Sequence, residues 1–185
     1  SATLGPNDDS VLDTVMSYYA VPGVLSTPHN IDRLPSTPMS LDIDAMQALY
    51  GANASSRPGD DLYVFDSAAR YLQTIYDTGG NDTIQLTGNT GGEIDLRPGQ
   101  WSLLGIPIAV NGTPQASLDT VRIYHATLIE NAIGGDGNDT LIGNDINNDL
   151  NGGNGNDLMT GGPGNDRFDW EAAYRAGNDS MEGGP

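Results

Sequence analysis

The spacing of apolar residues changes once along this chain. From Leu41 to Tyr50 the apolar positions fit one face of a short helix, which Gly51 should end. Beyond Asn53, short apolar runs alternate with Gly, Pro, Asn and Asp, a pattern typical of stacked β layers. Prolines interrupt residues 1–40, so that stretch should be mostly loop. The predicted strands span residues 61–66, 72–76, 83–87, 93–96, 106–110 and 121–124.

A nine-residue repeat runs without a gap from Gly134 to Asp169. Each of its four units has Gly at the first position, Asp or Asn at the sixth and an apolar residue at the eighth. A flexible linker can also be rich in Gly, Asn and Asp, but a linker has no reason to keep this phase. The sixth positions are Asp139, Asn148, Asp157 and Asp166, and the eighth are Leu141, Leu150, Met159 and Phe168.

These units follow the motif G-G-x-G-x-D-x-U-x, the calcium-binding repeat of RTX proteins. Its glycines permit a tight turn whose carbonyls face inward, and a short strand with one buried apolar side chain follows. An oxygen ligand at every sixth position suits a hard cation that takes six to eight oxygens. The sequence therefore predicts a mostly β fold, an RTX parallel β-roll (a β-solenoid) with stacked β layers, preceded by a loop and a short helix.

The charge of the chain points to cations as partners. The formal net charge is −18, with 25 acidic residues against 7 basic ones. A phosphate backbone would be repelled, which argues against nucleic acid as a partner. Many carboxylates fall in the turns of the repeat, where they would repel one another unless several calcium ions neutralise them. The sequence shows no cysteine, no recognisable signal peptide and no apolar stretch long enough to span a membrane.

Further segments, in a shared order, carry a family resemblance. They are Thr14-Val15-Met16-Ser17-Tyr18, the helix and its end from Asp42 to Asn53, Asp77-Thr78-Gly79-Gly80-Asn81-Asp82-Thr83, and Ile129-Glu130-Asn131-Ala132-Ile133-Gly134-Gly135. With these motifs the chain resembles the serralysin family of secreted bacterial zinc metalloproteases, the RTX branch of the metzincins. The resemblance implies that residues 1–53 are the C-terminal remnant of a metzincin protease domain. Residues 54–185 would be a calcium-binding β-sandwich and β-roll domain that drives folding after secretion.

The resemblance also implies catalytic roles, which this chain carries only in part. Met16 would be the Met-turn methionine beneath the zinc, and Tyr18 a zinc ligand or a transition-state hydrogen-bond donor. The motif H-E-x-x-H-x-x-G-x-x-H, which supplies three zinc ligands and a general base, is not in the sequence, whose two histidines are His29 and His125. We therefore expect zinc and protein substrates only in the intact parent enzyme, so this chain alone should be inactive. The family further implies an extracellular protein secreted by the type I route.

The same resemblance places calcium between neighbouring turns. One site would use Arg57, Gly59, Asp61, Asp77, Gly79 and Asp82, and a second would use Gly80, Asp82, the carbonyl of Leu128 and Glu130. In the repeats, Gly135, Gly137 and Asp139 should face Gly152, Asn154 and Asp157, while Asn144, Ile146 and Asn148 should face Gly161, Pro163 and Asp166. Because Asn148 carries no charge, the site that it joins should be the weaker of these two.

The frame of the repeat breaks near Trp170. A further unit fits residues 174–182 if four extra residues bulge outward. The carbonyls of Tyr174 and Ala176 and the carboxylate of Asp179 would then face Gly153, Gly155 and Asp157 around another calcium ion. A next site would pair Gly162, Gly164 and Asp166 with Gly183 and Pro185, and it should be incomplete because the chain is cut in mid-repeat.

Two functions remain after these observations. The first is a C-terminal fragment of a serralysin-like zinc metalloendopeptidase, with the missing N-terminal protease part as a candidate partner besides calcium. The alternative is a non-enzymatic RTX calcium-binding module of an adhesin or another secreted protein. The Met-turn and the Leu-Tyr-Gly-Ala-Asn segment favour the first, because an adhesin needs neither.

Overall fold

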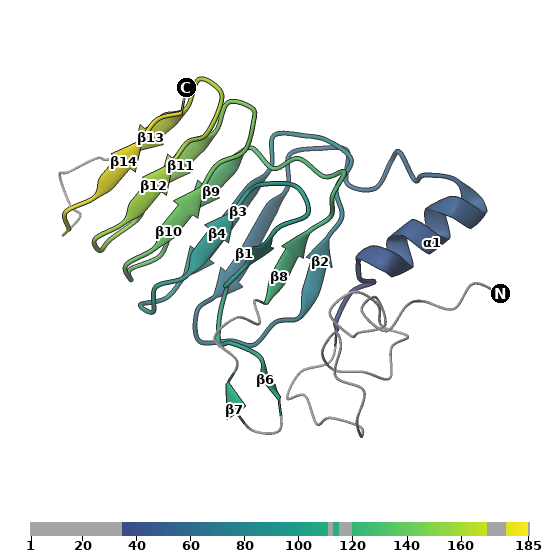
Figure 1. Cartoon of the computed structure of the whole chain (residues 1–185), viewed down its shortest axis with the longest axis horizontal. Helices are drawn as coiled ribbons and strands as arrows, with labels where there is room; N and C mark the ends of the chain where they lie inside the picture. Colours follow the sequence, from purple (N-terminus) through teal and green to yellow (C-terminus); the bar gives the residue numbers. More distant parts are fainter. Residues whose placement is uncertain (1–34, 111–112, 115–119, 170–176, 185) are drawn as a thin grey trace.

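A computed structural model of the protein describes residues 35–110, 113–114, 120–169 and 177–184. In these ranges a single helix, α1 (Ser40–Tyr50), precedes a series of short strands (Figure 1). The described part of the chain is therefore mostly β. The strands are β1 (Leu62–Asp66), β2 (Gln73–Ile75), β3 (Thr83–Thr87), β4 (Glu93–Asp95), β5 (Trp101–Ser102), β6 (Ala109–Val110), β7 (Thr113–Pro114), β8 (Val121–Ile123), β9 (Asn131–Ile133), β10 (Thr140–Ile142), β11 (Asp149–Asn151), β12 (Leu158–Thr160), β13 (Arg167–Asp169) and β14 (Ser180–Glu182).

Two parallel sheets contain most of these strands (Figure 1). One has the order β1-β3-β9-β11-β13, and the other has the order β14-β12-β10-β4. Consecutive strands of the repeat alternate between the two sheets, so each strand pairs with the strand two units away. Asp149 thus lies beside Arg167, 18 residues further along the chain, which is twice the nine-residue period. A smaller sheet holds β2, β8 and β5, and β6 pairs with β7.

The core lies between the two parallel sheets. Leu141, Leu150 and Met159, each the eighth residue of its unit, are fully buried and belong to one apolar cluster with residues of β3 and β4. Removing each of these side chains from water stabilises the fold by roughly 1.5–3 kcal/mol. Phe168 is only partly buried, because β13 is the last strand in the order of its sheet.

Glycines allow neighbouring turns on the same edge to touch. Gly153 and Gly155 have φ angles of 91° and 119°, a backbone region that favours glycine. A Cβ atom on Gly153 would lie 2.1 Å from the carbonyl oxygen of Gly135, and one on Gly155 would lie 2.0 Å from that of Gly137. Both the backbone conformation and the close approach therefore exclude a side chain at these positions.

The helix α1 lies beside β2 and far from β13 and β14 (Figure 1). Its first turn is capped by Asp42, whose Oδ2 accepts the amide of Met39 at 2.8 Å, and it ends at Gly51. Ile43 is buried, whereas Met46, Leu49 and Tyr50 are 56%, 73% and 78% exposed. The described residues therefore bury only a small part of the apolar face that the sequence predicted.

Polar contacts attach α1 to the β region. The hydroxyl of Tyr124 donates to Asp44 Oδ1 at 2.6 Å, and burial together with this bond raises the pKa of Tyr124. The side-chain amide of Gln47 donates to the hydroxyl of Tyr76 at 3.3 Å. Tyr76 directly precedes Asp77, so the helix contacts the segment that carries one of the clustered acids described below.

Most of the predicted elements are confirmed, since α1 and the strands predicted at 61–66, 72–76, 83–87, 93–96 and 121–124 are all present within one residue at each end. The prediction for residues 106–110 was wrong over its first part, because only Ala109–Val110 is a strand there. Pro107 interrupts that run and has no N–H to donate to a neighbouring strand. β5, β7 and β9 were not predicted, and β5 and β7 have only two residues each, too few to show a periodicity in the sequence.

Candidate metal centre

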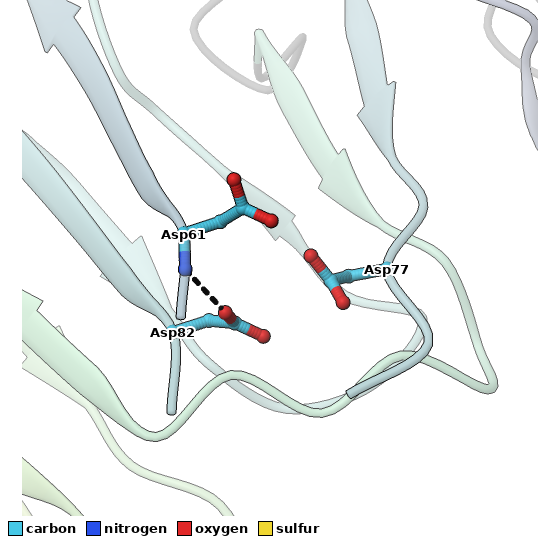
Figure 2. Close-up of side chains that lie close together, drawn as sticks. All are labelled: Asp61, Asp77 and Asp82. Carbon is cyan, nitrogen blue, oxygen red and sulfur yellow. Dashed lines mark hydrogen bonds between the residues drawn. The ribbon is translucent and has the colours of Figure 1, made fainter. Parts of the chain in front are cut away.

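Three aspartates from separate segments converge at one edge of the first parallel sheet (Figure 2). Asp61 directly precedes β1, Asp82 directly precedes β3, and Asp77 follows β2. The parallel pairing of β1 with β3 aligns the two strand starts and so places Asp61 beside Asp82. One carboxylate oxygen from each of the three lies within 4.8 Å of the others.

Asp82 is the most buried member of this cluster, with no solvent exposure. Its Oδ1 accepts the amide of Asp61 at 2.8 Å, and its own amide donates to Glu130 Oε2 at 2.8 Å. Among the described residues, its Oδ2 has no hydrogen-bond partner. A buried polar atom left in that state costs about 1–3 kcal/mol, and more when it is charged, so this oxygen needs a positive partner.

Hydrogen bonds also fix the direction of Asp77, which is 2% exposed. The amide of Gly79 donates to Oδ1 at 2.9 Å, and the hydroxyl of Tyr63 donates to Oδ2 at 2.5 Å. Thr127 Oγ1 accepts the backbone amide of Asp77 and donates to its carbonyl, at 3.0 and 2.9 Å. The carboxylate therefore has little rotational freedom and stays on the side of the other two acids, as Figure 2 shows.

Burial and crowding perturb the acids of the turns. Burial, together with the negative charges of Asp77 and Glu130, raises the pKa of Asp82 to about 6, although the amide hydrogen bond from Asp61 opposes this shift. Burial likewise raises the pKa of Asp139, although amides of two glycines oppose this shift. The pKa of Tyr63 is raised by burial and by its bond to Asp77. Each acid shift reflects a carboxylate whose negative charge is poorly compensated.

The structure brings together the two sets of residues predicted around these acids. A Cβ atom on Gly80 would lie 2.3 Å from the carbonyl oxygen of Gly59, so the two loops touch. Arg57 lies at their rim, with Nη1 3.7 Å from Asp61 Oδ1. Glu130 joins the cluster through Asp82, and Leu128, whose side chain has no oxygen, could contribute only its carbonyl oxygen. Gly79 contacts Asp77 as described above.

The turns of the repeat stack in the predicted pairs on the other edge. The amide of Asp139 donates to Asp157 Oδ1 at 2.8 Å, and the amide of Asn154 donates to the carbonyl of Gly135 at 2.9 Å. Together with the contact between Gly155 and Gly137, these bonds align residues 134–139 with residues 152–157. The predicted partners Gly135, Gly137 and Asp139 therefore do face Gly152, Asn154 and Asp157.

The second predicted pair of turns is also present, on the edge that carries Asp82. The amide of Asn148 donates to Asp166 Oδ1 at 2.9 Å. Cβ atoms on Gly162 and Gly164 would lie 2.9 and 2.6 Å from the carbonyl oxygens of Asn144 and Ile146. Residues 144–148 thus lie against residues 161–166, which include Gly161 and Pro163.

The four-residue insertion after β13 is confirmed. β14 pairs with β12 in parallel, and the amide of Asp157 donates to Asp179 Oδ1 at 3.0 Å, 22 residues apart instead of 18. Asp179 therefore reaches the predicted place beside Asp157. The other residues predicted there, Tyr174 and Ala176, lie outside the described residues, and so does Pro185.

Comparison with known proteins gives the family. A family model described as "Peptidase M10 serralysin C terminal" matches residues 40–183. The chain belongs to this family. It is 36% identical over 147 residues to Serralysin of Proteus mirabilis and 39% identical over 147 residues to Serralysin of Photorhabdus luminescens, and each match covers 72% of this chain and 28% of the relative. It is also 39% identical over 119 residues to Metalloprotease AprA of Pseudomonas entomophila, which covers 57% of this chain and 22% of that protein.

The chain thus spans about 28% of the length of the serralysins that it matches. The match begins at Ser40, and Met16 and Tyr18 lie outside the described residues, so the roles predicted for them stay predictions. His29 also lies outside the described residues. His125 is described, and its Nε2 lies 3.8 Å from Asp44 Oδ1. No helix among the described residues is long and apolar enough to cross a membrane.

Some residues that shape this serralysin-type site were not identified from the sequence. Tyr63 and Thr127 orient Asp77 from positions 14 and 50 residues away along the chain. The alternation of β1 could have indicated which side of the strand Tyr63 occupies, but nothing in the sequence sets the register that places its hydroxyl on Asp77. The side chain of Asn148 was predicted only as an oxygen ligand, and the donor groups of Asn144 and Asn148 were overlooked.

Proposed function

We propose that this chain is the calcium-binding C-terminal part of a serralysin-type secreted zinc metalloendopeptidase. Family membership supports this over the alternative of a non-enzymatic module, since the matching relatives are named serralysin or metalloprotease. The observation that carries the calcium assignment is Asp82, a fully buried carboxylate with an oxygen that lacks a partner among the described residues. The carboxylates of Asp61, Asp77 and Glu130 lie around it and offer only oxygen atoms to a cation.

The chemistry of these donors fits calcium. Hard divalent cations of this size take six to eight oxygens from carboxylates and backbone carbonyls, and the described residues of the cluster offer both kinds of oxygen. Arg57, Gly59, Asp61, Asp77, Gly79 and Asp82 would hold one ion, and Gly80, Asp82, Leu128 and Glu130 a second. A bound ion would supply positive charge where these oxygens converge, which lets the acids be buried close together.

A repeated hydrogen-bond pattern supports further sites along both edges. In several pairs of stacked turns, the backbone amide of one acid donates to a carboxylate oxygen of the next acid: Asp61 to Asp82, Asp139 to Asp157, and Asp157 to Asp179. One oxygen of each acid is thereby fixed toward the chain. The predicted ligands of the repeat are Gly135, Gly137, Asp139, Asn144, Ile146, Asn148, Gly152, Gly153, Asn154, Gly155, Asp157, Gly161, Pro163, Asp166, Tyr174, Ala176 and Asp179.

We assign the architecture of residues 54–185 to an RTX parallel β-roll on the same grounds. Strands that alternate between two parallel sheets, with partners 18 residues apart, support this assignment. Residues 1–53 would be the remnant of the protease domain. The zinc-binding motif is not in the sequence, so of the residues around the zinc this chain would supply only Met16 and Tyr18. Proteolysis of protein substrates would belong to the intact parent.

An extracellular location agrees with this proposal. Extracellular calcium modules bind their ion with dissociation constants of roughly 10⁻⁴–10⁻³ M, so they fill only where calcium is abundant. Acidic turns that repel one another without calcium would keep the chain unfolded during export and let it fold outside the cell. Type I secretion, which the family implies, would be the route.

Calcium titration tests the proposal. The purified chain, depleted with a chelator, should lose its β circular dichroism cooperatively and regain it on addition of calcium but not of an equal concentration of magnesium. Magnesium is the control because it demands near-ideal octahedral geometry and keeps its own waters. Circular dichroism that stayed unchanged in excess chelator, together with no calcium bound in equilibrium dialysis, would contradict the proposal.

A further inference from the structure

Two buried asparagines donate hydrogen bonds inside the turn that connects β10 to β11. Asn144 and Asn148 are 2% and 3% exposed. The amide nitrogen of Asn144 donates to the carbonyls of Ile129 at 2.8 Å and of Leu96 at 3.2 Å, and that of Asn148 donates to the carbonyl of Glu130 at 3.0 Å. All three carbonyls belong to segments that precede this turn in the stack.

The equivalent turn nine residues earlier has no such donors. There Asp139 accepts the amide of Gly135 on Oδ2 and the amide of Gly92 on Oδ1, both at 2.7 Å. Asn148 keeps the first of these bonds, since its Oδ1 accepts the amide of Asn144 at 2.8 Å. Its second side-chain atom is a nitrogen, which points at a carbonyl oxygen instead of receiving an N–H.

The orientation of the Asn148 amide follows from its neighbours. The backbone N–H of Asn144 requires an acceptor and the carbonyl of Glu130 requires a donor, so only one of the two amide orientations satisfies both. Asn144 Oδ1 accepts a further bond from Asn148 Nδ2 at 3.1 Å, which joins the two side chains into one network. These hydrogen bonds therefore hold both side-chain amides with N–H groups directed at the carbonyls of residues 129 and 130.

We propose that these two amides take the place of a calcium ion between residues 128–130 and residues 143–148. The inference rests on the proposed function, in which the other stacked turns hold calcium. Buried carbonyl oxygens need a positive partner, and either a cation or an N–H can supply it. An amide nitrogen has no lone pair to offer a metal, so the N–H groups both satisfy these carbonyls and exclude an ion.

As a consequence, hydrogen bonds instead of a calcium ion hold residues 128–130 against residues 143–148. This contact divides the edge that carries Asp82 into two calcium-binding segments, one formed by Asp61, Asp77, Asp82 and Glu130 and the other by residues 144–148 with 161–166. Replacing the amide of Asn148 by a carboxylate would put an oxygen about where Nδ2 now lies, 3.0 Å from the carbonyl oxygen of Glu130. Two such oxygens repel each other unless a cation lies between them.

The test is therefore a gain of binding. Asn148→Asp should bind one more calcium ion per chain than the wild type, counted by equilibrium dialysis with elemental analysis, and calcium should raise its Tm further than it raises that of the wild type. Asn147→Asp is the matched control: it adds the same charge one residue away, at an exposed position whose Oδ1 already accepts the amide of Asn165. The control should bind the same number of ions as the wild type.

The number of calcium ions bound by the two variants tests the inference. An unchanged number of ions in Asn148→Asp overturns the inference, and so does a variant that fails to fold in saturating calcium, because the proposal requires that the ion be accepted. An extra ion in both variants would indicate nonspecific attraction and would also overturn it. The proposed function fails separately, if the wild type itself binds no calcium in the same dialysis.

Discussion

Replacing Asp82 by asparagine should have opposite effects on the calcium-free and the calcium-loaded protein. The change removes one negative charge and keeps the size of the side chain, and an amide oxygen can still accept the N–H of Asp61. The new amide N–H₂ would lie among the acids, where acceptors are plentiful. Without calcium, the substitution should therefore stabilise the fold; with calcium, it should weaken binding.

The expected size follows from the distances. Carboxylate oxygens of Asp61, Asp77 and Asp82 lie within 4.8 Å of one another. Two unit charges at that distance repel by about 1 kcal/mol in bulk water and by about 3.5 kcal/mol at an effective dielectric constant of about 20. Asp82 has two such neighbours, so its neutralisation should favour the calcium-free fold by roughly 2–7 kcal/mol. Loss of a charged ligand should weaken calcium binding roughly tenfold or more, which corresponds to at least about 1.4 kcal/mol.

The effect should also depend on pH. Because the pKa of Asp82 is raised from its ordinary value of 3.8 to about 6 in the fold, protonation favours folding. This stabilisation is fully present below about pH 4 and is lost as the pH rises through about 6. The calcium-free wild type should therefore gain stability as the pH falls from 7.5 to 5, and its difference from Asp82→Asn should shrink over that range.

The assay is the folded fraction and Tm by far-ultraviolet circular dichroism, in excess chelator and in saturating calcium. Asp60→Asn is the control, since Asp60 carries the same charge on the neighbouring loop beside Asp61, is exposed and accepts the amide of Asn81. If Asp82→Asn proved less stable than the wild type in chelator, or behaved like Asp60→Asn, the assignment of Asp82 as an uncompensated buried charge would be refuted.

Three other substitutions test separate parts of the structure. Tyr63→Phe removes the hydroxyl that orients Asp77, so the free energy of calcium binding, measured by calorimetry, should weaken by roughly 1.5–3 kcal/mol, the range for a hydrogen bond to a charged group. Tyr71→Phe is the control: the hydroxyl of Tyr71 accepts the amide of Asp66, so its loss should leave the affinity unchanged. Leu141→Ala should lower the free energy of unfolding in calcium by about 2–5 kcal/mol, because Leu141 is fully buried between the sheets. A loss below about 1 kcal/mol, measured by urea titration, would mean that the core is not packed there. Gly155→Ala should lower the free energy of unfolding by roughly 2–4 kcal/mol, because φ would be strained and the new Cβ would meet Gly137. Gly183→Ala has open space around its Cβ and should lower it little. Equal Tm values for the two variants would contradict the stacking of the turns.

The sequence was most informative where its pattern repeats. Gly, Asp and apolar residues kept in phase over four units identified the strands and the buried positions. An alternating strand between two tight turns leaves few other positions for the buried side chain. The offset of Asp179 by four residues could be predicted for the same reason, because a bulge between two regular units does not change their stacking. Irregular parts were harder, and β5 and β7 depend on pairing with distant strands more than on local preference.

What the sequence alone determined is the list of oxygen-bearing residues and the period with which they return. Only the tertiary structure decided which of these oxygens are available to an ion, because availability depends on hydrogen bonds between residues far apart in the chain. Asp82 keeps one buried oxygen without a partner among the described residues, whereas Asn148, at an equivalent position, donates to the carbonyl of Glu130. Asp77 is aimed by Tyr63 from a neighbouring strand. Periodicity places a side chain on a turn, but the register of distant segments sets the direction of its polar atoms.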